Sequence, residues 1–255
     1  MIRAVVFDWA GTLVDHGSRA PALAFVEAFA RFGVEATEAE ARAPMGLEKR
    51  AHLRAMLAGA PLRARWEAAQ GEAGEAAVAR LYEAFAPLAA DIAAREAAPV
   101  PGAPEALAAL RARGLRIGST TGYAREIMDH VIPRAAAAGV SPEVAICADE
   151  VKAPRPAPDM ILAAMAALGE GDPAAILVVD DSTPGIEAAR AAGARAVGVT
   201  LSGNGAGLSA EALAALAPAA RAALRGPAAA PLLAAGAEAA LDSVADLPAW
   251  LEAQA

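Results

Sequence analysis

Five residues near the start of the chain, Asp8-Trp9-Ala10-Gly11-Thr12, combine an acidic side chain with a tight turn. They follow Val5-Val6-Phe7, an apolar run too short for a helix, which predicts a buried strand. Gly11 lets the chain turn sharply where a side chain would clash. Asp8 is therefore expected at the carboxyl end of a first strand, where open α/β sheets bind ligands. Its carboxylate can serve as a nucleophile or a metal ligand; a turn Asp that caps the next helix is the alternative.

Three more apolar runs predict strands, over residues 115–118, 175–179 and 194–199. The first ends in Ser119-Thr120-Thr121-Gly122 and the second in Asp180-Asp181-Ser182, and the loop between them carries Arg155. In chain order this is a strand with Asp, a strand with Thr, a loop with a cation and a strand with an acidic pair. The order resembles the four motifs of the haloacid dehalogenase superfamily.

Ala10 narrows the range of leaving groups that the site could expel. Phosphomonoesterases of that superfamily usually carry a second Asp two residues after the nucleophile, where it protonates a leaving alkoxide. Alanine cannot donate a proton. Either the enzyme is impaired, or its leaving group needs no acid at this position.

Lysine is rare in this chain. Among 22 lysines and arginines only Lys49 and Lys152 are lysine, and lysine, unlike arginine, can lose its proton and form a Schiff base. Pro44 predicts a helix start, after which Met45, Lys49 and His52 share one face. An ammonium held against Met45 would be desolvated and its pKa lowered. The alternative is a solvated lysine on an amphipathic helix.

These features together resemble the phosphonoacetaldehyde hydrolase (phosphonatase) family. The matching motifs are Phe7 to Thr12, Pro44 to Lys49 and Gly118 to Tyr123. The resemblance covers nearly the whole chain, and the pair Trp9-Ala10 together with Lys49 is highly specific. Further matches are Arg155-Pro156, Val179-Asp180-Asp181, Leu201-Ser202-Gly203-Asn204 and Leu241-Asp242-Ser243-Val244.

The resemblance implies a Schiff base on Lys49, which makes the departing carbon an enamine, and attack by Asp8 on phosphorus to form an aspartyl phosphate. The resemblance implies that carbon and not oxygen departs from phosphorus, so the missing acid at Ala10 and the presence of Lys49 explain each other. The implied residues are Asp8, Lys49, His52 and Tyr123 for catalysis, Met45, Thr121, Gly122 and Arg155 for substrate binding, and Asp8, the Ala10 carbonyl and Asp181 for Mg²⁺.

One departure concerns the metal site. Some family members carry an acid four residues after the last motif's Asp, where this chain has Gly185. Asp180, directly before Asp181, is the candidate to supply the missing carboxylate.

The chain is predicted to form an α/β, Rossmann-like parallel-sheet core of residues 1–16 and 99–255, with residues 17–98 inserted as an α-helical cap. The cap is expected to move as a body against the core. The alanine-rich tract 210–235 is predicted to form short surface helices, broken at its prolines and Gly226. Ala22, Phe25, Val26 and Phe29 share a helical face that would suit a homodimer through the cap helices.

Composition excludes several functions. A net charge of −8 without a basic run argues against nucleic acid as a partner, and no uncharged apolar stretch reaches membrane-spanning length. The single cysteine, Cys147, ends an apolar run and is expected in the core. The amino terminus leads straight into a strand with no secretory signal, so a cytoplasmic protein is expected. The family resemblance implies a small phosphonate substrate. A phosphatase acting on another small phosphorylated or phosphonate substrate, and a catalytically silent binding protein, remain alternatives.

Overall fold

The computed structural model describes residues 1–254 and is built around a six-stranded parallel sheet of order β3-β2-β1-β4-β5-β6. The strands are β1 Ala4–Phe7, β2 Arg116–Thr121, β3 Val144–Cys147, β4 Ile176–Asp180, β5 Arg195–Val199 and β6 Ala239–Leu241. The predicted α/β class with a parallel-sheet core is confirmed.

Both faces of the sheet are covered, which explains why its strands read as continuous apolar runs. Successive residues of β1 point to opposite faces: Val5 and Phe7 join one core cluster, and Ala4 and Val6 join the other. The first cluster includes residues of α6 Ala103–Ala112, α7 Arg125–Ala137 and α12 Leu247–Glu252; the second includes residues of α8 Asp159–Ala167 and α9 Thr183–Ala191. Short 3₁₀ helices occupy Ala148–Glu150, Pro173–Ala175 and Val244–Asp246.

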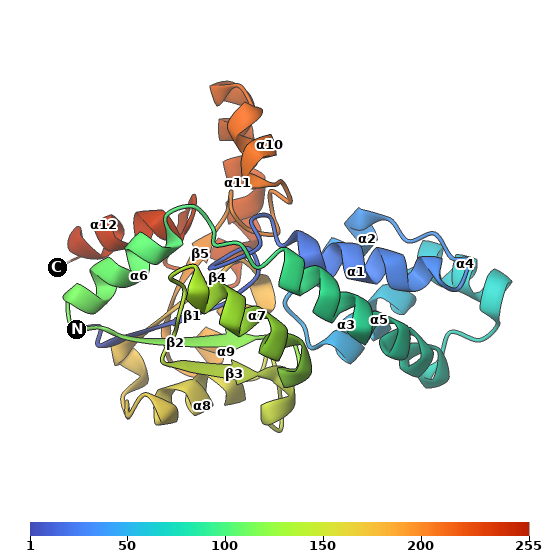
Figure 1. The fold of residues 1–255 in the computed structure, drawn as a ribbon, viewed down its shortest axis with the longest axis horizontal. Coiled ribbons are helices and arrows are strands. Elements are labelled where there is room, and N and C mark those ends of the chain that lie inside the picture. Colours follow the sequence, from blue (N-terminus) through green and yellow to red (C-terminus); the bar gives the residue numbers. More distant parts are fainter. Residues whose placement is uncertain (255) are drawn as a thin grey trace.

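The regular secondary structure of the inserted cap consists of helices joined by turns and loops. Figure 1 shows the cap helices grouped at the end of the molecule farthest from both termini. Two of these helices end at glycines: Gly59 follows α3, and Gly71, with φ +86°, follows α4. The boundaries at residues 16/17 and 98/99 stay a prediction. The cap helices are α1 Arg19–Ala30, α2 Glu38–Arg42, α3 Lys49–Ala58, α4 Ala60–Gln70 and α5 Glu75–Arg95.

The apolar face of α1 is not free for a second copy of the chain. Ala22, Phe25 and Phe29 are fully buried. Phe25 stacks on Phe85 of α5 with ring centroids 4.3 Å apart, and Phe29 meets the Trp66 ring edge-on. The sequence identified an apolar face correctly but assigned it to the wrong contact, because a helical stripe does not reveal which element covers it. A homodimer would need another surface and stays a prediction.

The alanine-rich tract differs from the prediction. It forms α10 Ala210–Ala215 and then one 17-residue helix, α11 Pro218–Ala234, which runs through Gly226, Pro227 and Pro231. Alanine has the highest helix propensity, and the prolines are exposed, so water can satisfy the carbonyls they leave unpaired. Figure 1 shows this helix pair projecting from the core. Within residues 1–254, no helix is both long and apolar enough to cross a membrane.

Cys147 is fully buried at the end of β3. Burial raises the pKa of its thiol to about 12, which keeps it protonated and poorly reactive. The predicted core role is confirmed.

Candidate active site

The site lies where the sheet reverses its strand order. β1 is flanked by β2 on one side and β4 on the other, and Phe7 is in register with Ser119 and Val179. The loops after these strands therefore leave the same edge of the sheet, at the switch point where α/β proteins bind ligands. Gly11, with φ +84°, is required in the first loop, because a Cβ there would lie 2.3 Å from an Asp181 oxygen.

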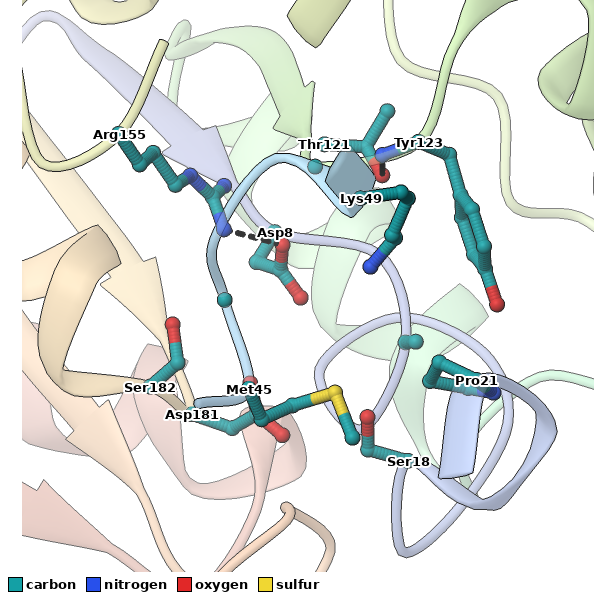
Figure 2. Close-up of a pocket in the computed structure, with 13 residues that line it drawn as sticks. Asp8, Ser18, Pro21, Met45, Lys49, Thr121, Tyr123, Arg155, Asp181 and Ser182 are labelled. Carbon is teal, nitrogen blue, oxygen red and sulfur yellow. Dashed lines mark hydrogen bonds and ion pairs between the residues drawn. The ribbon is translucent and has the colours of Figure 1, made fainter. Parts of the chain in front are cut away.

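A pocket at this edge is lined by residues of both the core and the cap. Figure 2 shows Lys49 from the cap and Asp8 from the core pointing into the same space. Nine sequence-predicted residues line it: Asp8, Ala10, Met45, Lys49, Thr121, Gly122, Tyr123, Arg155 and Asp181. Two other predicted residues, His52 and Asp180, are fully buried and do not line the pocket.

Arg155 forms ion pairs with two of the carboxylates at the pocket, Asp8 and Asp180. Its Nη1 donates to Asp8 Oδ1 at 2.8 Å and lies 3.0 Å from Asp180 Oδ2. Its Nη2 donates to the Thr120 hydroxyl at 2.6 Å. This guanidinium is almost completely buried, so it fixes a positive charge and a planar set of donors at the site. Thr120 and not only the predicted Thr121 therefore shapes this region.

Three buried carboxylates meet at the centre. Oxygens of Asp8, Asp180 and Asp181 lie within 4.8 Å of one another. Burial raises the pKa of Asp8, and the Asp180 charge adds to the effect, while burial and Asp8 raise the pKa of Asp181. All the candidate ligand atoms are carboxylate oxygens, and Asp180 Oδ2 makes no hydrogen bond; its ion-pair partner is Arg155 Nη1 at 3.0 Å. The donor set fits a hard divalent cation, which would offset the repulsion that raises these pKa values.

The Asp180 carboxylate lies directly against the backbone of Gly185. Asp180 Oδ1 accepts from the Ser182 backbone N–H at 2.9 Å and from the Ser182 hydroxyl at 2.7 Å. A Cβ built on Gly185 would lie 1.9 Å from Asp180 Oδ2. The Asp180 carboxylate thus occupies the space into which a side chain at position 185 would extend, which supports the prediction that Asp180 replaces the acid missing there.

Lys49 is a buried amine at the start of a helix. It is the first residue of α3, whose N-cap, Glu48, accepts from two backbone N–H groups of the first turn. Burial lowers the pKa of Lys49 to about 8, although the Asp8 charge acts to raise it. Its Nζ lies 4.5 Å from the centre of the Tyr123 ring and 5.8 Å from that of Phe25. The amine is therefore far easier to deprotonate than a solvated lysine, and the solvated alternative is wrong.

The helix begins later than predicted. Residues 44–47 form a turn, and Gly46 has φ +94°, which favours glycine and interrupts helical geometry. Met45 therefore lies before α3 and not on its face. It still lines the pocket with Lys49, because the turn folds it back toward the core.

His52 and Tyr123 flank Lys49 in different ways. His52 is fully buried, stacks on Phe25 at 3.8 Å, and places Nε2 2.8 Å from the Ala41 carbonyl. Burial lowers the pKa of His52 well below its usual range, so the ring is neutral. Tyr123 lines the pocket, and burial raises the pKa of its hydroxyl, which has no hydrogen-bond partner. Their roles in proton transfer stay predictions.

The cap turn is seated closely on the core. A Cβ on Gly46 would lie 2.3 Å from Ser182 Oγ, and one on Gly122 would lie 2.9 Å from the Leu47 carbonyl oxygen. Glycine on each side allows backbone to approach backbone or a short side chain. The sequence predicted contact by Gly122 but did not reveal the reason for a glycine at that position.

Four lining residues were missed by sequence reasoning: Ser18, Pro21, Gly46 and Ser182. Ser182 directly follows Asp181, and Gly46 follows Met45, so adjacency to motif residues was an available signal. Ser18, near the start of the cap, has φ +49°, a conformation that no pattern in the sequence indicates.

Comparison with known proteins agrees with this geometry. Residues 2–193 match the family model of the haloacid dehalogenase-like hydrolases. The phosphonoacetaldehyde hydrolase of Paraburkholderia phytofirmans is 44% identical over 96% of this chain and 92% of that protein, and the one from Bordetella pertussis is 44% identical over 97% and 90%. The crystal structure of a phosphonoacetaldehyde hydrolase-like protein from Oleispira antarctica superimposes with a TM-score of 0.96 at 39% identity, over 99% of this chain and 92% of that one.

The fold and the acidic switch-point site define the class, and the chain belongs to the haloacid dehalogenase-like hydrolases. Within that class its full-length relatives place it in the phosphonoacetaldehyde hydrolase family. A putative β-phosphoglucomutase from Thermotoga maritima, with a TM-score of 0.61 at 22% identity, shares the fold alone.

Proposed function

We propose that the protein hydrolyses the phosphorus–carbon bond of phosphonoacetaldehyde, giving acetaldehyde and phosphate. One observation carries the proposal: a buried lysine with a lowered pKa faces a buried aspartate across one pocket. A carbanion is a very poor leaving group, and an aldehyde one carbon from phosphorus offers a remedy. The amine can convert that aldehyde into an electron sink while the carboxylate attacks phosphorus.

The first step is imine formation at Lys49. The neutral amine adds to the aldehyde carbon, the aldehyde oxygen leaves as water, and an iminium ion remains. Lys49 is suited to this step because burial favours the neutral amine. Tyr123, whose ring centre lies 4.5 Å from the Lys49 amine, is the residue we assign to proton transfer. His52 links α3, which carries Lys49, to α2 through the Ala41 carbonyl.

The second step is attack by Asp8 on phosphorus. As the new oxygen–phosphorus bond forms, the phosphorus–carbon pair moves into the iminium system and gives an enamine. Arg155 and Thr121 are assigned to the phosphonyl oxygens, Arg155 because its fork already spans Asp8 and the strand edge. Two waters complete the cycle: one hydrolyses the aspartyl phosphate, and one releases acetaldehyde from the protonated enamine.

Mg²⁺ is the cofactor we assign to the acidic cluster. Asp8, Asp181 and the Ala10 carbonyl would hold it, and Asp180 would support the cluster through Arg155. When bound, it supplies positive charge that brings the anionic phosphonate and the Asp8 carboxylate together.

The direct test is incubation with phosphonoacetaldehyde and Mg²⁺, with acetaldehyde and phosphate measured together. We expect the two products in equal amounts. The alternative phosphatase lacks its acid, because position 10 is alanine. Rapid release of p-nitrophenol from p-nitrophenyl phosphate, without acetaldehyde from the phosphonate, would contradict the proposal and favour that alternative.

Activity should fall at acid pH through the titration of Lys49. Only the neutral amine attacks, so kcat/KM should rise with pH and level off near the Lys49 pKa of about 8. Asp8 raises that pKa, so the rate of borohydride trapping in an Asp8→Asn variant should level off at lower pH. A plateau reached only near the ordinary lysine pKa in the native protein would show that burial does not activate the amine.

Mg²⁺ should stabilise the fold. Three buried carboxylates face one arginine, so a bound cation relieves their repulsion in the folded state. At about 100 times Kd, binding adds about 2.7 kcal/mol to the free energy of unfolding. A thermal melt with and without Mg²⁺ measures this gain, which Asp181→Asn should abolish and Asp129→Asn, at an exposed position, should retain. An equal gain in both variants would place the cation elsewhere.

A further inference from the structure

Arg42, the last residue of cap helix α2, joins the cap to the core. Its Nη1 donates to the Asn204 side-chain oxygen at 3.0 Å and to the Gly17 carbonyl at 2.9 Å. Its Nη2 donates to the Gly207 carbonyl at 3.3 Å. One guanidinium thus contacts Gly17, where the cap begins, and the core loop that follows β5.

Glu38 orients this guanidinium from within the cap. Its Oε1 accepts from Arg42 Nε at 2.9 Å and from Nη2 at 2.6 Å. Nη1 is then left to bridge Gly17 and Asn204, while Nη2 also reaches Gly207. The Arg42 side chain is only 15% exposed, so its donors depend mainly on protein acceptors. An open cap would separate the guanidinium from those acceptors.

The core loop is shaped to receive Arg42. Gly207 has φ +66°, and a Cβ there would lie 3.0 Å from the Arg42 guanidinium carbon. Asn204 returns a hydrogen bond, because its Nδ2 donates to the Arg42 carbonyl at 3.3 Å. The contact is therefore reciprocal and short, unlike an ion pair between flexible surface side chains.

The same loop holds a side chain of the acidic cluster. The backbone N–H of Asn204 donates to Asp181 Oδ2 at 2.7 Å. The residue that receives Arg42 through its side chain therefore orients Asp181 through its backbone. This is a continuous path from the cap, through Arg42 and Asn204, to Asp181.

We propose that Arg42 and Asn204 are positioning residues that couple closure of the cap to the orientation of Asp181. Their pairing forms only when the cap lies against the core, and it fixes the loop whose N–H sets the Asp181 carboxylate. The site then gains its full affinity for a cation in the same arrangement that brings Lys49 to Asp8. The inference rests on the proposed function only for its catalytic consequence.

The test compares Arg42→Ala and Asn204→Ala with Arg63→Ala, a control whose arginine pairs with Glu67 on the cap surface. Titration calorimetry with Mg²⁺ alone measures affinity without substrate. We expect Kd to rise about tenfold in both test variants, the size of one charge-assisted hydrogen bond, and to stay unchanged in the control. The double variant should lose little more than either single one, because both remove the same interaction.

Cap position is measured separately. Spin labels at Glu83→Cys on α5 and Glu187→Cys on α9, in a Cys147→Ala background, report the distance between cap and core. Arg42→Ala should lengthen and broaden it, and Arg42→Lys should do so less. At saturating Mg²⁺, kcat should fall about tenfold while KM changes less.

Unchanged Mg²⁺ affinity and unchanged distances in Arg42→Ala and Asn204→Ala would overturn the coupling, even if activity were lost. If Arg42→Ala does not fold, Asn204→Ala decides, since it leaves the cap untouched. Because affinity and distance need no substrate, they test the coupling even if the native protein fails to cleave phosphonoacetaldehyde.

Discussion

Lys49→Arg is expected to abolish turnover while keeping the positive charge in the pocket. A guanidinium does not lose its proton at working pH and cannot form an imine with the aldehyde. The loss should be on the order of 10⁴ or more in kcat, as when a covalent nucleophile is removed from other enzymes. Substrate consumption and acetaldehyde formation measure it directly.

The chain supplies its own control for this experiment. Lys152, the other lysine, is exposed and lies outside the pocket, so Lys152→Arg should turn over normally. Borohydride added with substrate should label the native protein and the Lys152→Arg variant at Lys49, as located by peptide mass spectrometry. A Lys49→Arg variant that works normally, or native protein that borohydride leaves unlabelled, would rule out the Schiff base.

Asp8→Asn should separate the two half-reactions. The amide cannot attack phosphorus, but Lys49 is untouched, so imine formation should persist while phosphate release falls by roughly 10⁴ or more. Borohydride trapping reports the first step, and phosphate release reports the second. The variant also removes one partner of Arg155, so its folding is checked by its melting curve.

Asp129→Asn, a change at an exposed aspartate, serves as the matched control and should release phosphate normally. Phosphate release at an ordinary rate from Asp8→Asn would remove Asp8 as the nucleophile. Loss of trapping together with release would instead mean that Asp8 is needed before the imine forms.

The sequence predicted the central part of this arrangement well. Apolar runs ending in polar residues located β1, β2 and β4, and strand ends at a switch point must converge, so Asp8, Thr121 and Asp181 were found. The rarity of lysine among the basic residues of this chain identified Lys49. These signals are local, and each could be read without knowing what lies opposite.

What could not be predicted depends on contacts between distant segments. Ser18 and Ser182 enter the pocket from separate loops, and Arg42 meets a core loop 162 residues away in sequence. The burial of Phe25 required knowledge of α5. Local rules also failed at α11, where alanine propensity and solvent exposure outweighed two internal prolines.

The close fit of Asp180 over Gly185 restricts how this protein can change during evolution. If position 185 gained a side chain first, that side chain would collide with the Asp180 carboxylate. If the Asp180 carboxylate were lost first, Arg155 would lose one of its partners. The two positions are therefore epistatic: each tolerated residue depends on the other, and single steps between arrangements pass through a weakened enzyme. A motif that scores position 185 alone would misjudge such sequences, so both positions should be read as a pair.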